Sequence, residues 1–174
     1  MKNFTCRFLL FLLGIMPLLS WGQTYWTAAT SRDWNVAANW SPSVVPTATS
    51  NVVIGYTSEQ NSPIIQAGTA AVANSVQLNI GALLTIASGG SITIDGATTA
   101  FTASLLNNGT IENSGIIRVE PAENTTITYG LYMQGTAQNV AKFINKSGGE
   151  IHIDGTSTSG IFMQTNSLFS NEDK

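Results

Sequence analysis

From about residue 73 onward, the chain alternates apolar and polar residues in short stretches. Isoleucine, leucine and valine occupy every second position in residues 76–80, 84–86, 92–94, 117–119 and 151–153. A period of two over a few residues is typical of β-strands with one buried face. Turn-forming pairs such as Asp95-Gly96 separate the stretches. The pattern predicts an all-β chain of short strands joined by tight turns.

The second regularity is an internal repeat. Residues 130–134 (GLYMQ) return thirty residues later as residues 160–164 (GIFMQ). Residues 92–96 (ITIDG) return as residues 151–155 (IHIDG), a separation of 59 residues that is close to two such periods. A period near 30 that holds several short strands predicts one turn of a parallel β-helix per repeat, with about five coils in the chain.

Asparagine recurs in the turns of this repeat. Residues 106–108 (LNN) resemble residues 144–146 (INK), and residues 169–171 (FSN) are interpreted as the start of a third copy. Equivalent turns of a parallel β-helix stack, so Asn107 and Asn145 are expected to form a ladder of side-chain hydrogen bonds without any ligand. An antiparallel β-sandwich remains the competing fold. It predicts hairpins every 8–12 residues or so, but gives no reason for a repeat near 30.

Residues 23–72 form a lead segment, which we separate from the repeat array at residues 73–174. Trp26, Trp34 and Trp40 lie within fifteen residues and follow neither a helical nor a strand period. One interpretation, which we favour, is a cap that covers the open end of the array, as solenoids require. The alternative is a ligand-binding platform on which these three rings stack sugars, as in a carbohydrate-binding module.

Residues 1–22 are predicted to be a signal peptide. Two basic residues precede an apolar run of about a dozen residues, which is too short to span a bilayer comfortably. Small residues at Ser20 and Gly22 place cleavage after Gly22, and the mature chain is not expected to span a membrane. Cleavage also removes Cys6, the one cysteine of the chain, so the exported domain is expected to fold without a disulfide.

The charge balance excludes some partners. The whole chain has seven Lys and Arg residues against ten Asp and Glu residues, and the signal peptide holds two of the basic ones. Nucleic acids and anionic lipids attract proteins with clustered Lys and Arg, so neither is a predicted partner.

Several motifs carry a family resemblance. They are Trp26, residues 33–35 (DWN), residues 39–40 (NW), Pro46, residues 61–65 (NSPII), residues 108–111 (NGTI) and the GIxMQ-type elements. With these motifs the chain resembles the N-terminal region of large secreted β-helix proteins of Bacteroidetes, whose arrays are filament and adhesin repeats. The resemblance covers most of the mature chain. It implies a right-handed parallel β-helix, a handedness that the general rule for parallel crossovers also gives.

The same resemblance implies a function. The expected protein is a non-enzymatic, adhesin-like scaffold, secreted or held at the outer surface of a Gram-negative bacterium. Surface glycans or other cell-surface proteins are the partners that it suggests. Such proteins often end in a sorting domain for the type IX secretion system, and none follows the array here. Because the array stops inside a repeat element, we expect the chain to be the N-terminal part of a longer protein.

The residues predict no catalytic centre. His152 stands alone between two isoleucines, and a lone histidine does not make a zinc site. The enzymatic alternative is a polysaccharide lyase or hydrolase, which needs acidic Ca²⁺ ligands and a base on one face. Its candidate residues are Asp95, Glu112, Glu120, Asp154 and Arg118. Asp95 and Asp154 repeat with the fold, which favours turn chemistry over catalysis. We therefore predict no enzyme, no cofactor and no metal site, while calcium binding by the Asp-Gly turns stays open.

Overall fold

The structure is a computed structural model that describes residues 22–96, 103–120 and 127–172. The predicted signal peptide lies outside these residues, except for Gly22. Strands dominate the described part of the chain, which confirms the all-β prediction. Its helices are two 3-10 turns, η1 (Ala37–Asn39) and η2 (Glu59–Asn61), and neither is long and apolar enough to cross a membrane.

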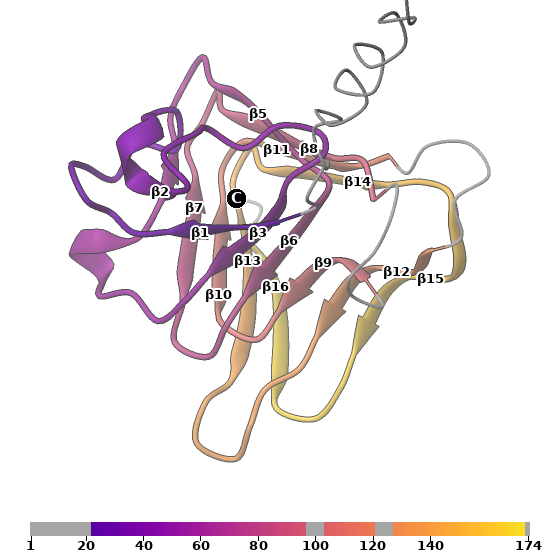
Figure 1. Cartoon of the computed structure of the whole chain (residues 1–174). Coiled ribbons are helices and arrows are strands. Elements are labelled where there is room, and N and C mark those ends of the chain that lie inside the picture. The colour runs from indigo at the N-terminus through magenta and orange to yellow at the C-terminus, as the bar shows by residue number, and fades with distance from the viewer. Residues whose placement is uncertain (1–21, 97–102, 121–126, 173–174) are drawn as a thin grey trace, which may run out of the picture.

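The strands form three sheets (Figure 1). Sheet A holds β1 (Gln23–Trp26), β2 (Trp40–Ser41), β3 (Asn51–Ile54), β6 (Ser75–Leu78), β9 (Ala103–Asn107), β12 (Ile127–Met133) and β15 (Thr156–Met163). Sheet B holds β4 (Ile64–Ile65), β7 (Leu83–Ile86), β10 (Thr110–Asn113), β13 (Ala141–Lys146) and β16 (Ser167–Glu172). Sheet C holds β5 (Ala70–Ala73), β8 (Ser91–Ile94), β11 (Ile116–Val119) and β14 (Glu150–Ile153).

From β3 onward the chain visits the sheets in rotation, A, then B, then C. We call three successive strands, one in each sheet, a round. Each strand pairs in parallel with the strand of the same sheet in the next round. The described residues make four complete rounds, followed by β15 and β16 of a fifth. The antiparallel pair β1 and β2 precedes them at one edge of sheet A.

The core is a set of columns that run from round to round. In sheet B, Leu84 lies opposite Ile111, and Ile111 lies opposite Phe143. All three side chains are buried, because alternate residues of each strand face the interior that the sheets share. In sheet C, Ile92 lies opposite Ile117 in the same way. The parallel pairing therefore turns the alternation seen in the sequence into one continuous core.

Two repeat assignments made from the sequence are confirmed by the strand register. Leu131 lies opposite Ile161, so the GLYMQ and GIFMQ elements are one round apart. Ile151 lies opposite Ile117, which itself lies opposite Ile92, so the 59-residue separation spans two rounds. One strand assignment is wrong. Ile80 lies outside β6 and is exposed, because the chain turns after Leu78.

The structure contains a ladder of asparagine side chains, but Asn113 takes the place predicted for Asn107. The Asn113 amide donates to the Asn145 Oδ1 at 2.8 Å, and the Asn145 amide donates to the Asn171 Oδ1 at 3.0 Å. Asn107 is not part of this ladder. It ends β9 in sheet A, where it lies opposite Met133, and its amide donates to the Lys142 carbonyl. The predicted equivalence of Asn107 and Asn145 is therefore wrong.

Candidate functional site

The three tryptophans of the lead segment pack against one another at the start of the array. Trp26 and Trp40 meet edge to face with ring centroids 4.9 Å apart, and Trp34 and Trp40 do so at 4.7 Å. Trp26, Trp34 and Trp40 are 7%, 0% and 1% exposed. The Trp40 indole N–H donates to the Trp34 carbonyl, and that of Trp26 donates to the Asn61 carbonyl, both at 2.7 Å.

The burial of these three tryptophan rings argues against the sugar-binding platform considered from the sequence. A sugar stacks on the open face of an aromatic ring, and these three rings have their faces covered by protein. The structure therefore gives Trp26, Trp34 and Trp40 no sugar-binding surface. Their edge-to-face packing is the arrangement that buried aromatic clusters prefer, and it favours the interpretation as a cap.

Asn39 holds the lead segment in place. Its Oδ1 accepts hydrogen bonds from the Thr30 and Ser31 backbone N–H groups, each at 2.9 Å, and its amide donates to the Asp33 carbonyl. This side chain is fully buried. The segment around Asp33 in turn forms a parallel bridge with Ile64 of β4. The chain before the first round thus covers the free edge of sheet B.

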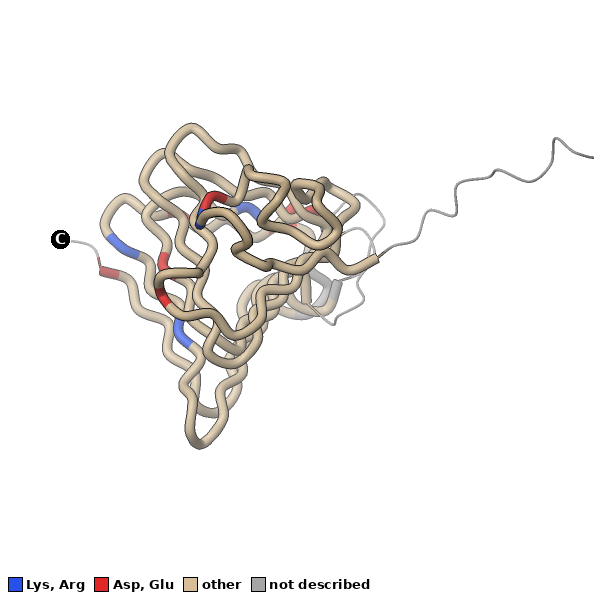
Figure 2. Tube along the Cα trace, turned by 60° about the vertical axis from the view of Figure 1, so that its left-hand side comes forward, with Lys and Arg blue, Asp and Glu red and all other residues tan. Residues whose placement is uncertain are grey.

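The enzymatic candidates are spread over two sheets. Glu112 lies on β10 in sheet B, where its carboxylate accepts from the Lys146 ammonium at 2.7 Å. Arg118 lies on β11 in sheet C and forms an ion pair with Glu120 at 3.6 Å. Both ion pairs are substantially exposed. Figure 2 shows how few charged residues interrupt the otherwise uncharged trace.

Asp95, Glu120 and Asp154 occupy one corner in three successive rounds. The backbone N–H of Asp95 donates to Ala73, that of Glu120 to Ile94, and that of Asp154 to Val119, so each follows its sheet C strand in the same way. Partial burial, and secondarily the Glu120 carboxylate, raise the pKa of Asp95 above its usual value. The sequence analysis recognised Asp95 and Asp154 as equivalent positions, but named Glu120 only as an enzymatic candidate and not as a member of this series. A one-round alignment of residues 92–95 with residues 117–120 would have found it.

None of these acids gathers into a metal centre in the described ranges 22–96, 103–120 and 127–172, where no group of three or more metal-binding side chains occurs. His152, on β14, forms a 2.9 Å hydrogen bond with the Glu150 carboxylate at an exposed position. This pair contains only two groups of the kind that bind metals, and both belong to one strand.

A partly exposed aromatic group lies on sheet A. The Phe162 ring stacks on Tyr129 with centroids 4.7 Å apart and lies 5.4 Å from Tyr132. Tyr132 and Phe162 occupy the same place in the GLYMQ and GIFMQ elements, so the repeat itself predicts their contact. The described strands of sheet A contain no Asp, Glu, Lys, Arg or His. Sequence reasoning overlooked this group because it attended to the tryptophans.

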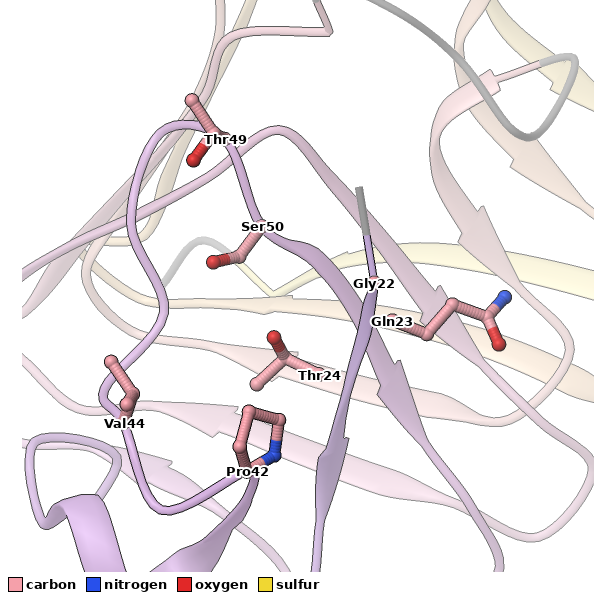
Figure 3. Close-up of a pocket in the computed structure, with 7 residues that line it drawn as sticks. All are labelled: Gly22, Gln23, Thr24, Pro42, Val44, Thr49 and Ser50. Carbon is pink, nitrogen blue, oxygen red and sulfur yellow. The ribbon is translucent and has the colours of Figure 1, made fainter. Parts of the chain in front are cut away.

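An open hollow of about 430 Å³ lies beside β1. Figure 3 shows Pro42, Val44, Thr49 and Ser50 on one loop around Thr24, while the Gln23 side chain points away from that loop. Its lining residues are uncharged, and among the described residues none of them has a buried polar atom without a hydrogen-bond partner. We assign it no ligand.

The fold and these surfaces define an all-β protein in which parallel strands accumulate round by round. The family model for a domain of unknown function, DUF8693, matches residues 25–152, which is well over half of the chain. The chain therefore belongs to the DUF8693 family. Comparison with curated proteins and with solved structures gave no match.

Proposed function

We propose that the chain is an exported, non-enzymatic scaffold of the adhesin-like kind, built as a right-handed parallel β-helix in which each round is one coil. The observation that carries the proposal is the strict strand rotation, in which every strand from β3 to β13 pairs in parallel with the strand three places later. Such an array grows by adding rounds, and its length scales with the number of repeats. Right-handedness follows from the strong preference of parallel crossovers for that hand.

The buried polar residues support a structural role. The Asn51 Oδ1 accepts from the Asn74 amide at 2.7 Å and from the Ser75 hydroxyl at 2.8 Å, which ties one round to the next. Asn113 and Asn145 do the same further along. Satisfied buried amides stabilise one register over its alternatives. These buried amides therefore hold neighbouring rounds together.

The location is the first thing to test. Cells that naturally produce the protein would be treated with a protease and the chain followed with an antibody. We expect the chain to be degraded while a periplasmic marker survives. A variant lacking residues 1–22 is the matched control and should remain intact inside the cell. Protection of the full chain together with the marker would overturn the surface assignment.

The lack of catalysis is tested separately. Purified chain would be incubated with acidic polysaccharides and Ca²⁺, and unsaturated products followed by their ultraviolet absorbance. We expect no product above a heat-denatured control. Turnover that disappears in Glu120→Gln or Arg118→Ala would establish the lyase alternative.

A neutral glycan is a second candidate ligand, on a different surface from the predicted one. The aromatic group of Tyr129, Tyr132 and Phe162 is partly exposed on a sheet without charged residues, and the C–H face of a pyranose ring packs well on such rings. A glycan array would compare the chain with Tyr132→Ala and with Trp34→Phe, which changes a buried ring. Loss of binding in Tyr132→Ala alone would support this site. Equal binding by all three proteins would remove it.

A further inference from the structure

The last round differs from the preceding round in how well its inward-facing residues are covered. Leu131 and Met133 of β12 are 0% exposed. Ile161 and Met163 occupy the same positions one round later and are 41% and 42% exposed. Phe169 is likewise only partly buried, whereas Phe143 opposite it is fully buried. The same column of apolar residues thus loses its cover in the last described round.

The backbone is open at the same place. Within the described residues, β14, β15 and β16 each have a neighbouring strand on one side only. β15 has eight residues and β16 has six, so these are among the longest strands of the protein. Long free strand edges present unpaired N–H and C=O groups, which makes them templates for another strand.

Three side-chain series reach this end and stop there. The Asn113 and Asn145 amides lead to Asn171, whose own amide donor has no partner in the described structure. The Phe143 ring stacks on Phe169 at 4.9 Å with planes 5° apart. The third series is the contact of Tyr132 with Phe162 on the outer side of sheet A. In each series the final side chain lies at the free edge of the last round.

At the opposite end, the core and the edges of sheets A and B are covered. The tryptophan cluster covers its core, β2 ends sheet A as an antiparallel strand, and the segment at Asp33 covers the edge of β4. A second copy therefore fits poorly at either end. The first-round end of a second copy would offer β4, which has only two residues, to the six-residue β16. If two copies instead met through their β14, β15 and β16 faces, the paired strands would run antiparallel. The asparagine and phenylalanine columns, which depend on parallel pairing, would then not continue across the contact.

From these contacts we infer that the face formed by β14, β15 and β16 docks one further coil of polypeptide with the same repeat chemistry. That coil carries apolar residues opposite Ile161 and Met163, an aromatic or branched apolar residue opposite Phe169 and an asparagine opposite Asn171. It pairs in parallel with all three strands. The inference rests on the proposed coil architecture but not on export, so the protease experiment above and the one below can fail independently.

The test adds such a coil to the full chain. Lys146 lies opposite Glu172, so a copy of residues 147–172 inserted directly after Glu172 continues the register. Ile161→Cys supplies a unique thiol in a chain that also carries Cys6→Ser, because Cys6 is the one cysteine of the sequence. We expect the added coil to slow thiol labelling at position 161 by at least about tenfold, as burial limits reaction to local opening.

Two controls make the result specific. In a matched insertion, the inward residues of the inserted copy alone are changed by Ile161→Ser, Met163→Ser and Phe169→Ser, which should leave labelling fast. Leu168→Cys reports an exposed position whose side chain lies opposite Lys142, and its labelling should change little. Equal protection by both insertions would overturn the inference. So would concentration-dependent dimerisation of the unextended chain that protects position 161, since the occupant would then be a second copy.

Discussion

The asparagine ladder offers a direct test of how the rounds are held together. Asn145 is 7% exposed and takes part in three side-chain hydrogen bonds. It accepts from Asn113 at 2.8 Å and donates to the Gly149 carbonyl at 2.7 Å and to Asn171 at 3.0 Å. The substitution Asn145→Ala removes all three bonds while leaving the backbone pairing of β13 in place.

The size of the effect follows from these contacts. An intramolecular hydrogen bond contributes about 1 kcal/mol net, so three bonds amount to about 3 kcal/mol. The Asn113 amide keeps a second acceptor, the Glu150 carbonyl, which limits its loss. The Gly149 carbonyl loses the hydrogen bond that the Asn145 amide donates to it. We therefore expect Asn145→Ala to lower the free energy of unfolding by about 2–3 kcal/mol.

Urea denaturation followed by circular dichroism measures this loss as a lower midpoint with an unchanged slope. Asn139→Ala is the matched control, because Asn139 is exposed and its side-chain amide makes no hydrogen bond in the described structure. Its effect should stay within about 0.5 kcal/mol. If both variants unfold at the same urea concentration, the ladder does not stabilise the fold and our reasoning fails.

Three further predictions concern other parts of the molecule. Trp40→Ala should lower the free energy of unfolding by about 3–5 kcal/mol, measured by urea denaturation, because it empties the centre of the cap; a loss below about 1 kcal/mol would contradict the cap. Gly115→Ala should cost about 1–3 kcal/mol in the same assay, since a Cβ there would lie 2.6 Å from the Ala87 carbonyl oxygen, and an unchanged midpoint would argue against this close stacking. Asp95→Asn should raise the melting temperature at neutral pH. A raised carboxyl pKa in the folded state favours the protonated form, so Asp95 destabilises the fold once pH rises through that pKa. Partial burial of Asp95, and secondarily the Glu120 charge, cause this penalty, and solvent screening limits the gain to about 0.5 kcal/mol. The gain should vanish at acid pH, and a gain that persists there would refute ionisation of Asp95 as its cause.

The sequence predicted the parallel rounds well where the repeat is most regular. The elements at Ile92 and Ile151 are separated by two rounds, as their spacing indicated, because inward isoleucines must stay in column. The equivalence of Asn107 and Asn145 failed for a physical reason. Both asparagines follow an apolar residue near a turn, but one ends a sheet A strand and the other lies in a sheet B strand. A short polar motif does not reveal which sheet its strand joins, because the strands of all three sheets recur with the same period.

The tryptophans illustrate a different limit. Their residue type fits both a buried cluster and an exposed platform, and the spacing of Trp26, Trp34 and Trp40 does not choose between the two. The choice depends on the path of the lead segment, which Asn39 fixes through contacts with Thr30 and Asp33. Those contacts are made by ordinary polar residues without a recognisable motif. The burial of the rings therefore required the structure.

Disulfide trapping tests the stacking of rounds most directly. In sheet C, Arg118 lies opposite His152, and Thr93 is one round further away on the other side of Arg118. Neighbouring parallel strands lie about 4.8 Å apart, within the range that a disulfide spans, whereas two rounds are about twice as far. The account predicts that Arg118→Cys with His152→Cys oxidises readily in the chain without Cys6, and that Thr93→Cys with His152→Cys does not. Equal oxidation of the two pairs, or oxidation of the second alone, would contradict the stacked rounds.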